Sequence, residues 1–133
     1  MAVLTFTYDE SFDPAMPVVE LQLAALETGI TSKTIKAMVD SGSDGSMMPI
    51  DALEEVGALS VGTAVMSGIW GNRQRVNIYY LSVRIGEHMI RGVRVAGIPT
   101  GMDALVGRNL LNQIVMTLNG PANSLEIPMD GLL

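Results

Sequence analysis

The most informative segment of this chain reads Ala37-Met38-Val39-Asp40-Ser41-Gly42-Ser43. Its three small or apolar residues are typical of the end of a buried strand. A carboxylate at that point is costly to bury unless the protein satisfies or uses it. Ser41 and Gly42 follow at once, and they offer a hydroxyl and a backbone that can turn sharply. We therefore interpret Asp40 as a candidate functional carboxylate at the end of a core strand.

A second segment, Ala104-Leu105-Val106-Gly107, repeats the pattern of residues 37–40 until its last position, where glycine stands in place of the acid. Such an echo is common by chance and carries little weight alone. The segment continues as Arg108-Asn109-Leu110-Leu111. Together with the Asp-Ser-Gly triplet, it resembles the signatures of the retropepsin-like branch of the aspartic proteases, and the resemblance runs from about Val18 to Leu118.

Size and composition limit the architecture. The chain has 133 residues, enough for one domain with a sizeable core but not for two lobes. Hydrophobic residues make up 48% and charged residues 17%, which indicates a globular protein. Fourteen glycines and six prolines separate short apolar runs, as in all-β proteins with tight turns.

We predict a single all-β domain over residues 1–133. The resemblance implies the retropepsin-like acid protease fold, a closed or partly closed barrel with a flap hairpin and one or two short helices. Within it, residues 1–17 would be an N-terminal extension and residues 66–73 the tip of the flap. Residues 119–133 would form a C-terminal hairpin or tail that could belong to a dimer interface.

Local patterns place the individual elements. In the long strand after the flap, the apolar face changes between Tyr80 and Leu81, which fits a projecting hairpin whose base joins the core, with a bulge as one cause. Helices are expected over residues 49–56 and 107–113. Strands are expected over residues 3–8, 19–23, 34–39, 60–66, 73–85, 89–95, 115–118 and 124–127.

Several classes of protein are disfavoured. Without cysteine there is no disulfide framework, thiolate nucleophile or cysteine-ligated zinc. The first residues lack the features of a secretory signal, and no apolar stretch approaches the ~20 residues of a membrane helix. A net charge of −6 argues against nucleic acid as the main partner. We expect a cytoplasmic protein with neither a membrane nor a nucleic acid as partner, although the chain could be a fragment of a longer one.

The basic residues are unevenly distributed. Five of the eight lie between positions 73 and 94. They could line a basic groove, but arginines on the solvent faces of strands, which discourage edge pairing, are the simpler interpretation. The five are Arg73, Arg75, Arg84, Arg91 and Arg94.

The resemblance implies a mechanism. Amide hydrolysis without a metal or covalent nucleophile needs a base for water and an acid for the carbonyl and the leaving nitrogen. Two carboxylates about 3 Å apart can do both because they share one proton. The chain has one Asp-Ser-Gly signature and no second lobe, so the resemblance implies a homodimer in which one Asp40 from each subunit meets at a twofold axis. Residues Leu125-Glu126-Ile127 could supply the interface strand. The substrate would be a peptide or protein, cleaved at mildly acidic pH without metal or cofactor.

Residues near Asp40 also receive roles from the resemblance. The Ser41 hydroxyl would reach across the axis to the partner, while Gly42 would allow the tight turn and Ser43 would continue the loop. Arg108 would form an ion pair with Asp44 and so brace the active-site loop. The alternative is that Arg108 is a solvent-facing arginine at the start of a helix and Asp44 an ordinary turn residue.

The segment Gly68-Ile69-Trp70-Gly71 resembles a flap tip that closes over the peptide and excludes water. Its spacing departs from the familiar Gly-Ile-Gly, so either Ile69 or Trp70 could present an amide to the substrate. An ordinary exposed hairpin is the alternative. The groove beneath would hold about six to eight extended residues by strand addition.

The predicted function is that of an aspartic endopeptidase in which two Asp40 carboxylates activate water. One alternative is a catalytically silent member of the same fold, acting as a dimerisation or peptide-binding module. The other is an unrelated β domain in which Asp40 is only a turn residue.

Overall fold

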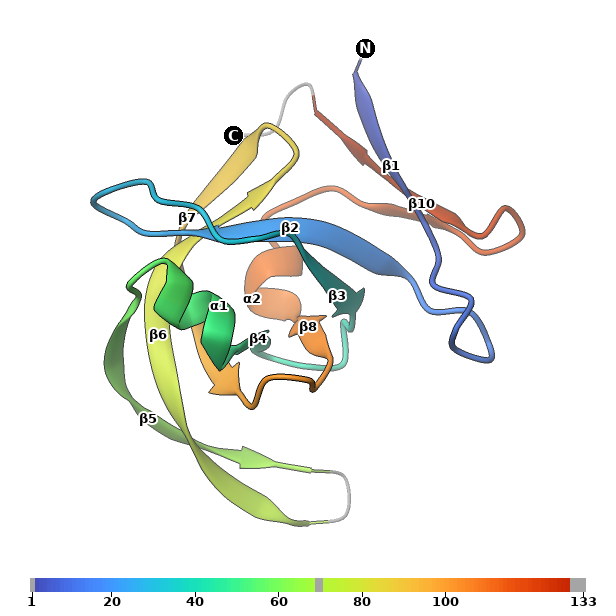
Figure 1. Cartoon of the computed structure of the whole chain (residues 1–133). Helices are drawn as coiled ribbons and strands as arrows, with labels where there is room; N and C mark the ends of the chain where they lie inside the picture. The colour runs from blue at the N-terminus through green and yellow to red at the C-terminus, as the bar shows by residue number, and fades with distance from the viewer. Residues whose placement is uncertain (1, 69–70, 130–133) are drawn as a thin grey trace.

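The computed structural model describes residues 2–68 and 71–129 (Figure 1). It is 54% strand and 8% helix, which confirms the all-β prediction. In the described part of the chain no helix has the length and apolar character needed to cross a membrane. In chain order the elements are β1 (Val3–Thr7), β2 (Val18–Ala24), β3 (Ile35–Val39), β4 (Ser46–Pro49), α1 (Ile50–Glu55), β5 (Leu59–Ser67), β6 (Arg73–Ile85), β7 (His88–Ile98), β8 (Ala104–Val106), α2 (Arg108–Leu111), β9 (Thr117–Asn119) and β10 (Ser124–Pro128).

A closed sheet forms the body of the molecule. Its strand order is β2-β3-β8-β4-β7-β6-β5, and β2 also pairs with β6. Among the described strands, six therefore close into a barrel, while β5 continues the sheet outward from β6. Helices α1 and α2 lie beside the barrel strands that precede them (Figure 1). The predicted barrel with a hairpin and two short helices is confirmed.

The two copies of the internal echo are neighbours in this sheet. Strands β3 and β8 run parallel, and Ala37, Met38 and Val39 pair in register with Ala104, Leu105 and Val106. The residues that follow the last pair are Asp40 and Gly107. The echo is therefore a structural repeat, in which one strand ends in a carboxylate and its neighbour ends in glycine.

Strands β5 and β6 form the long projecting hairpin that the apolar pattern predicted (Figure 1). The irregularities lie on the partner strands rather than on β6. Val61 is an extra residue in β5, and a second shift sets Leu81 and Val83 against a bulged part of β7 that contains Gly92. Gly92 has φ +72, a conformation that favours glycine. These bulges turn the base of the hairpin into the barrel.

The two ends of the described chain form a separate sheet in the order β1-β10-β9. Strand β10 is central, and Leu125 and Ile127 are buried at 0% and 1% exposure. Residues 125–127 therefore cannot supply an interface strand, because β1 and β9 of the same chain occupy both edges of β10. The predicted N-terminal extension contributes β1 to this sheet.

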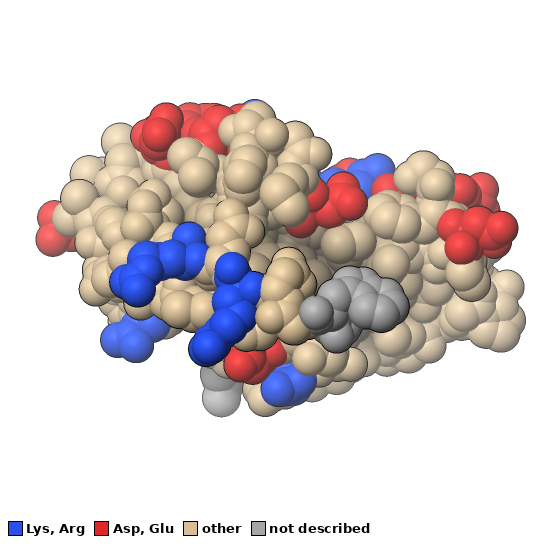
Figure 2. All heavy atoms as spheres, turned by 90° about the horizontal axis from the view of Figure 1, so that it is seen from below, with Lys and Arg blue, Asp and Glu red and all other residues tan. Residues whose placement is uncertain are grey.

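Charged side chains are unevenly spread over the surface. On the face seen from below in Figure 2, most Lys and Arg side chains in view gather in the left and lower part, and the largest groups of Asp and Glu lie along the upper edge and to the right. The β5–β6 hairpin lies on this side of the molecule, because it is the lowest part of Figure 1.

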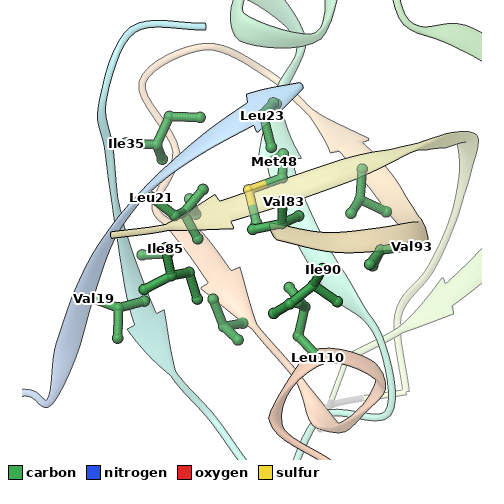
Figure 3. Close-up of a cluster of buried hydrophobic side chains, with 14 of the residues drawn as sticks. Val19, Leu21, Leu23, Ile35, Met48, Val83, Ile85, Ile90, Val93 and Leu110 are labelled. Atoms are coloured by element: carbon green, nitrogen blue, oxygen red, sulfur yellow. The ribbon is translucent and has the colours of Figure 1, made fainter. Parts of the chain in front are cut away.

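The core fills the barrel. In β2 the alternation predicted from sequence is present, with Val19, Leu21 and Leu23 buried. Figure 3 shows these side chains converging with residues from the facing strands and with Leu110 of α2. Each fully buried side chain of this size contributes about 1.5–3 kcal/mol. Met48 and Leu110, both at 0% exposure, anchor the elements that flank the end of β3.

Candidate active site

Asp40 lies at the end of β3 and is half-buried. Its backbone N–H donates to the Val106 carbonyl at 3.0 Å, so the strand pairing continues to this residue. Its Oδ1 accepts a hydrogen bond from the Gly42 N–H at 2.9 Å, and its carbonyl accepts one from the Ser43 N–H at 3.2 Å. A Cβ at Gly42 would lie 3.0 Å from Oδ1. The turn therefore orients one oxygen of the carboxylate, and glycine permits the close approach.

Gly107 occupies the equivalent place in the repeat, and it has no room for a side chain. A Cβ there would lie 2.7 Å from the Gly45 carbonyl carbon and 2.8 Å from the Ser43 carbonyl oxygen. Real Cβ atoms do not approach backbone this closely. This chain therefore cannot place a second carboxylate at the position that matches Asp40 without moving the loop.

Helix α2 is joined to the loop after Asp40 by a series of hydrogen bonds. The Arg108 N–H donates to the Ser43 carbonyl at 2.8 Å, and the Asn109 N–H donates to the Asp44 carbonyl at 3.3 Å. Arg108 Nη1 donates to the Ser41 carbonyl at 2.8 Å. These contacts hold both ends of the loop against the start of the helix.

The ion pair expected between Arg108 and Asp44 is absent. In the described residues the ion pairs join Lys33 to Asp51 and Lys36 to Asp9. The guanidinium of Arg108 is directed to a backbone carbonyl, and Asp44 meets α2 through its own carbonyl rather than its carboxylate. Arg108 thus contacts the loop as expected, but through a different partner.

A buried serine that the sequence did not single out connects three elements. Ser46, at 2% exposure, accepts a hydrogen bond from the Gly107 N–H at 2.9 Å and donates to Asn109 Oδ1 at 2.7 Å. Asn109 Nδ2 in turn donates to the Arg94 carbonyl at 2.7 Å. The network ties β4, β7 and α2 together directly behind the loop.

A groove of about 710 Å³ lies between this loop and the β5–β6 hairpin. Asp40 is not among its lining residues, although Ser43 and Asp44 of the same loop are. Of the five clustered arginines only Arg94 lines it. The other lining residues come from the loop before β4, from β4 itself and from β5, β6, β7 and α2; they are residues 45–47 and 61–67 with Ile78, Ala96 and Asn109.

The end of the hairpin is described up to Gly68 and from Gly71. Ser67 pairs with Arg73, the Gly68 N–H donates to the Asn72 carbonyl at 2.9 Å, and the Gly71 N–H donates to the Gly68 carbonyl at 3.0 Å. Gly71 has φ +78. These hydrogen bonds join the two described ends of the hairpin. The expectations for Ile69 and Trp70 concern residues outside the described part.

An ion pair between Lys33 and Asp51 lies outside the groove and shifts the pKa of both side chains. Lys33 Nζ lies 2.6 Å from Asp51 Oδ2, and this hydrogen bond lowers the pKa of the Asp51 carboxyl and raises the pKa of the Lys33 ammonium. The pair fastens the segment before β3 to α1. No group of three or more His, Asp or Glu side chains that could hold a metal ion occurs among the described residues.

A six-stranded barrel with a projecting hairpin and an Asp-Ser-Gly turn is the architecture of single-domain aspartic proteases. Residues 17–119 match the family model described as retroviral aspartyl protease. The match covers more than half of the chain, and the chain belongs to this family.

Solved structures agree with this assignment. A retropepsin-like aspartic protease from Rickettsia conorii has a TM-score of 0.64 and 14% identity over 95% of this chain and 90% of that chain. EIAV protease complexed with the inhibitor HBY-793 has a TM-score of 0.53 and 15% identity over 73% of this chain and 86% of that chain. The foamy viral protease–reverse transcriptase in complex with an RNA/DNA hybrid has a TM-score of 0.51 and 14% identity; the match covers 72% of this chain and 12% of that chain. At such identities the similarity shows the fold. No curated protein sequence matches the chain significantly.

Proposed function

We propose that this chain is an aspartic endopeptidase whose active site combines Asp40 from two subunits. One observation carries the proposal: in a member of an aspartyl protease family, the Asp40 carboxylate is held at the end of a core strand by the Gly42 N–H, on a loop that borders an open groove. Half-burial supports a carboxylate that is oriented by the fold yet accessible to water and peptide.

The chemistry needs one ionised and one protonated carboxyl. The ionised carboxylate removes a proton from a water molecule as the water oxygen attacks the scissile carbonyl carbon, while the protonated carboxyl donates to the carbonyl oxygen. The tetrahedral intermediate collapses when the C–N bond breaks: the leaving nitrogen takes the proton from one carboxyl, and a hydroxyl of the intermediate returns its proton to the other carboxylate as the product carboxyl forms. One water is consumed, and the two carboxyls again share one proton.

The second carboxylate comes from a second copy of the chain. The repeat cannot supply it, because Gly107 has no space for a side chain. The Ser41 hydroxyl makes no hydrogen bond within the described part of the chain and is exposed, so it is free to reach a partner loop, while its carbonyl is held by Arg108. In Figure 1 the loop after β3 lies between the hairpin below and the β1-β10-β9 sheet at the upper right, and Ser41, Gly42 and Asp44 of this loop are exposed.

We place the second contact of the homodimer at the free edge of β9. Residues 117–119 are exposed and carry no charge, and among the described strands they pair only with β10; Leu118 is 54% exposed. The other edge of this sheet, β1, instead borders a groove of about 530 Å³ shared with Val18, Glu20 and Lys36 of its own chain. Pairing of β9 with its copy would make one continuous sheet across the twofold axis.

The groove provides the binding surface for an extended peptide. Strand β5 pairs only with β6 among the described strands, so its second edge is available for strand addition. Met47, Met66 and Ile78 supply apolar surface from both walls. The hairpin above would fold down over bound substrate and exclude water, with Gly68 and Gly71 forming its turn.

The test compares wild type with Asp40→Asn on a peptide library at about pH 4–6, with mass-spectrometric detection of new termini. Asp103→Asn, an exposed acid outside the groove, is the matched control. We expect cleavage by wild type and by the control and none by Asp40→Asn. Cleavage that survives in Asp40→Asn would refute the mechanism. No cleavage by any of the three proteins would favour the silent peptide-binding or dimerisation module.

A further inference from the structure

Arg94 of β7 stands out among the residues that line the groove. Among the described lining residues it is the single basic side chain, and Asp44 is the single acidic one. Arg94 is exposed and forms no ion pair in the described part of the chain. An unpaired guanidinium in a binding groove is available to a ligand, and its five donors fit a carboxylate in a bidentate manner.

The backbone that carries this side chain is fixed relative to the active-site loop. The Arg94 carbonyl accepts the hydrogen bond from Asn109 Nδ2, and Asn109 is joined through Ser46 to Gly107. Arg94 also pairs across the sheet with Tyr80. The root of the guanidinium is therefore held in place before a ligand arrives, which reduces the entropy lost on binding.

The other arginines of the cluster do not share this position. Arg73 and Arg75 lie near the end of the hairpin opposite Ser67 and Val65, on alternate positions from Ile78, which lines the groove. Their spacing from Ile78 is odd, so their side chains leave β6 on the opposite face from Ile78, and neither arginine lines the groove. Of the five clustered arginines, Arg94 is therefore the one that lines the groove.

We propose that Arg94 selects substrates that carry an aspartate or glutamate side chain. The inference rests on the proposed endopeptidase function of the same groove. The acidic residue would lie away from the scissile bond, because Arg94 lines the groove and Asp40 does not. Preference for an acid must come from a local group such as Arg94, since the chain as a whole has a net charge of −6 and repels acidic peptides.

The test uses a substrate found by the library and its copies with Glu or Gln scanned along the sequence. All are amidated at the C-terminus, and one Gln copy keeps a free C-terminus to detect recognition of a terminal carboxylate. The proteins are wild type, Arg94→Gln, Arg94→Glu and Arg91→Gln, the last being an exposed arginine of the same strand outside the groove. Binding of the same peptides to Asp40→Asn, with and without Arg94→Gln, is measured by fluorescence anisotropy.

We expect wild type and Arg91→Gln to prefer Glu over Gln at one position by about five- to tenfold in kcat/KM, a preference that weakens as salt is raised. Arg94→Gln should lose the preference, and Arg94→Glu should reverse it, cleaving the Gln copy faster than the Glu copy at that position. Equal cleavage of all copies by wild type would overturn the role of Arg94 and leave the endopeptidase intact. Absence of cleavage with Arg94-dependent binding of the Glu peptide would refute catalysis alone. Absence of both, or recognition of the free C-terminus only, would overturn the proposal.

Discussion

Replacement of Gly107 by alanine tests the most constrained contact of the candidate site. The added Cβ would meet the backbone of Gly45 and Ser43 at 2.7 and 2.8 Å. Carbon atoms in favourable contact lie about 3.5–4.0 Å apart, so the loop or the start of α2 must move by about 1 Å. Both sides of the contact are backbone, and neither can rotate away as a side chain could.

The magnitude follows from this geometry. Overpacking of a rigid site costs about 1–3 kcal/mol, and we expect about 3 kcal/mol here because the obstacle is backbone. Displacement would also lengthen the hydrogen bond from the Gly107 N–H to Ser46. A domain of this size stays folded after such a loss, with a melting temperature lower by about 10 °C. The Asp40 turn moves with the loop, so the cleavage rate should fall even under conditions where Gly107→Ala is still fully folded.

The assay is urea unfolding at neutral pH, together with peptide cleavage. Gly45→Ala is the matched control, since its Cβ would have no heavy atom within 4 Å. The control should lie within about 0.5 kcal/mol of wild type. If Gly107→Ala is as stable as Gly45→Ala, Gly107 does not lie as close to the backbone of Ser43 and Gly45 as described. The explanation for a single carboxylate per chain then fails.

Two further substitutions test interactions around the site. Ser46→Ala leaves the Gly107 N–H and Asn109 Oδ1 without their buried partner, so we expect a loss of about 1–3 kcal/mol in urea unfolding; a change as small as that of the exposed Ser60→Ala would contradict it. Lys33→Met removes the ion-pair partner of Asp51. In wild type the pair lowers the pKa of Asp51 below its ordinary 3.8 and raises the pKa of Lys33 above its ordinary 10.5. The stability due to Asp51 is present above pH 3.8 and lost as pH falls through its lowered pKa, and that due to Lys33 is lost as pH rises through its raised pKa. The difference in melting temperature between Lys33→Met and wild type should thus be seen at pH 7 and close at acidic pH; an equal difference at both would refute the pairing.

Much of the fold is predictable from local patterns because they report burial directly. The alternation in β2, the apolar run before Asp40 and the change of face in β6 each correspond to a strand, and in β2 the buried positions were identified correctly. Strand β4 was missed because it has four residues and its inward positions are Ser46 and Met48, so its buried pattern includes a polar side chain. The hydroxyl of Ser46 is satisfied only by residues far away in sequence.

Other features depend on long-range geometry that a pattern does not contain. The family resemblance implied that Arg108 contacts the loop, but whether the guanidinium meets the Asp44 carboxylate or the Ser41 carbonyl depends on rotamers. The central place of β10 follows from pairing with β1, more than one hundred residues earlier in the chain. The spacing of apolar residues in 125–127 predicted a strand correctly and could not say which of its edges was free.

Mixing active and inactive chains tests the shared active site most directly. Asp40→Asn is titrated into a fixed amount of wild type, the chains are allowed to exchange, and the initial rate of peptide cleavage is recorded. If each site needs one Asp40 from each subunit, random pairing should lower the rate to about one half at equal amounts and about one tenth at a ninefold excess of the variant. A rate that is independent of added Asp40→Asn, under conditions where sedimentation shows exchange, would contradict the central claim.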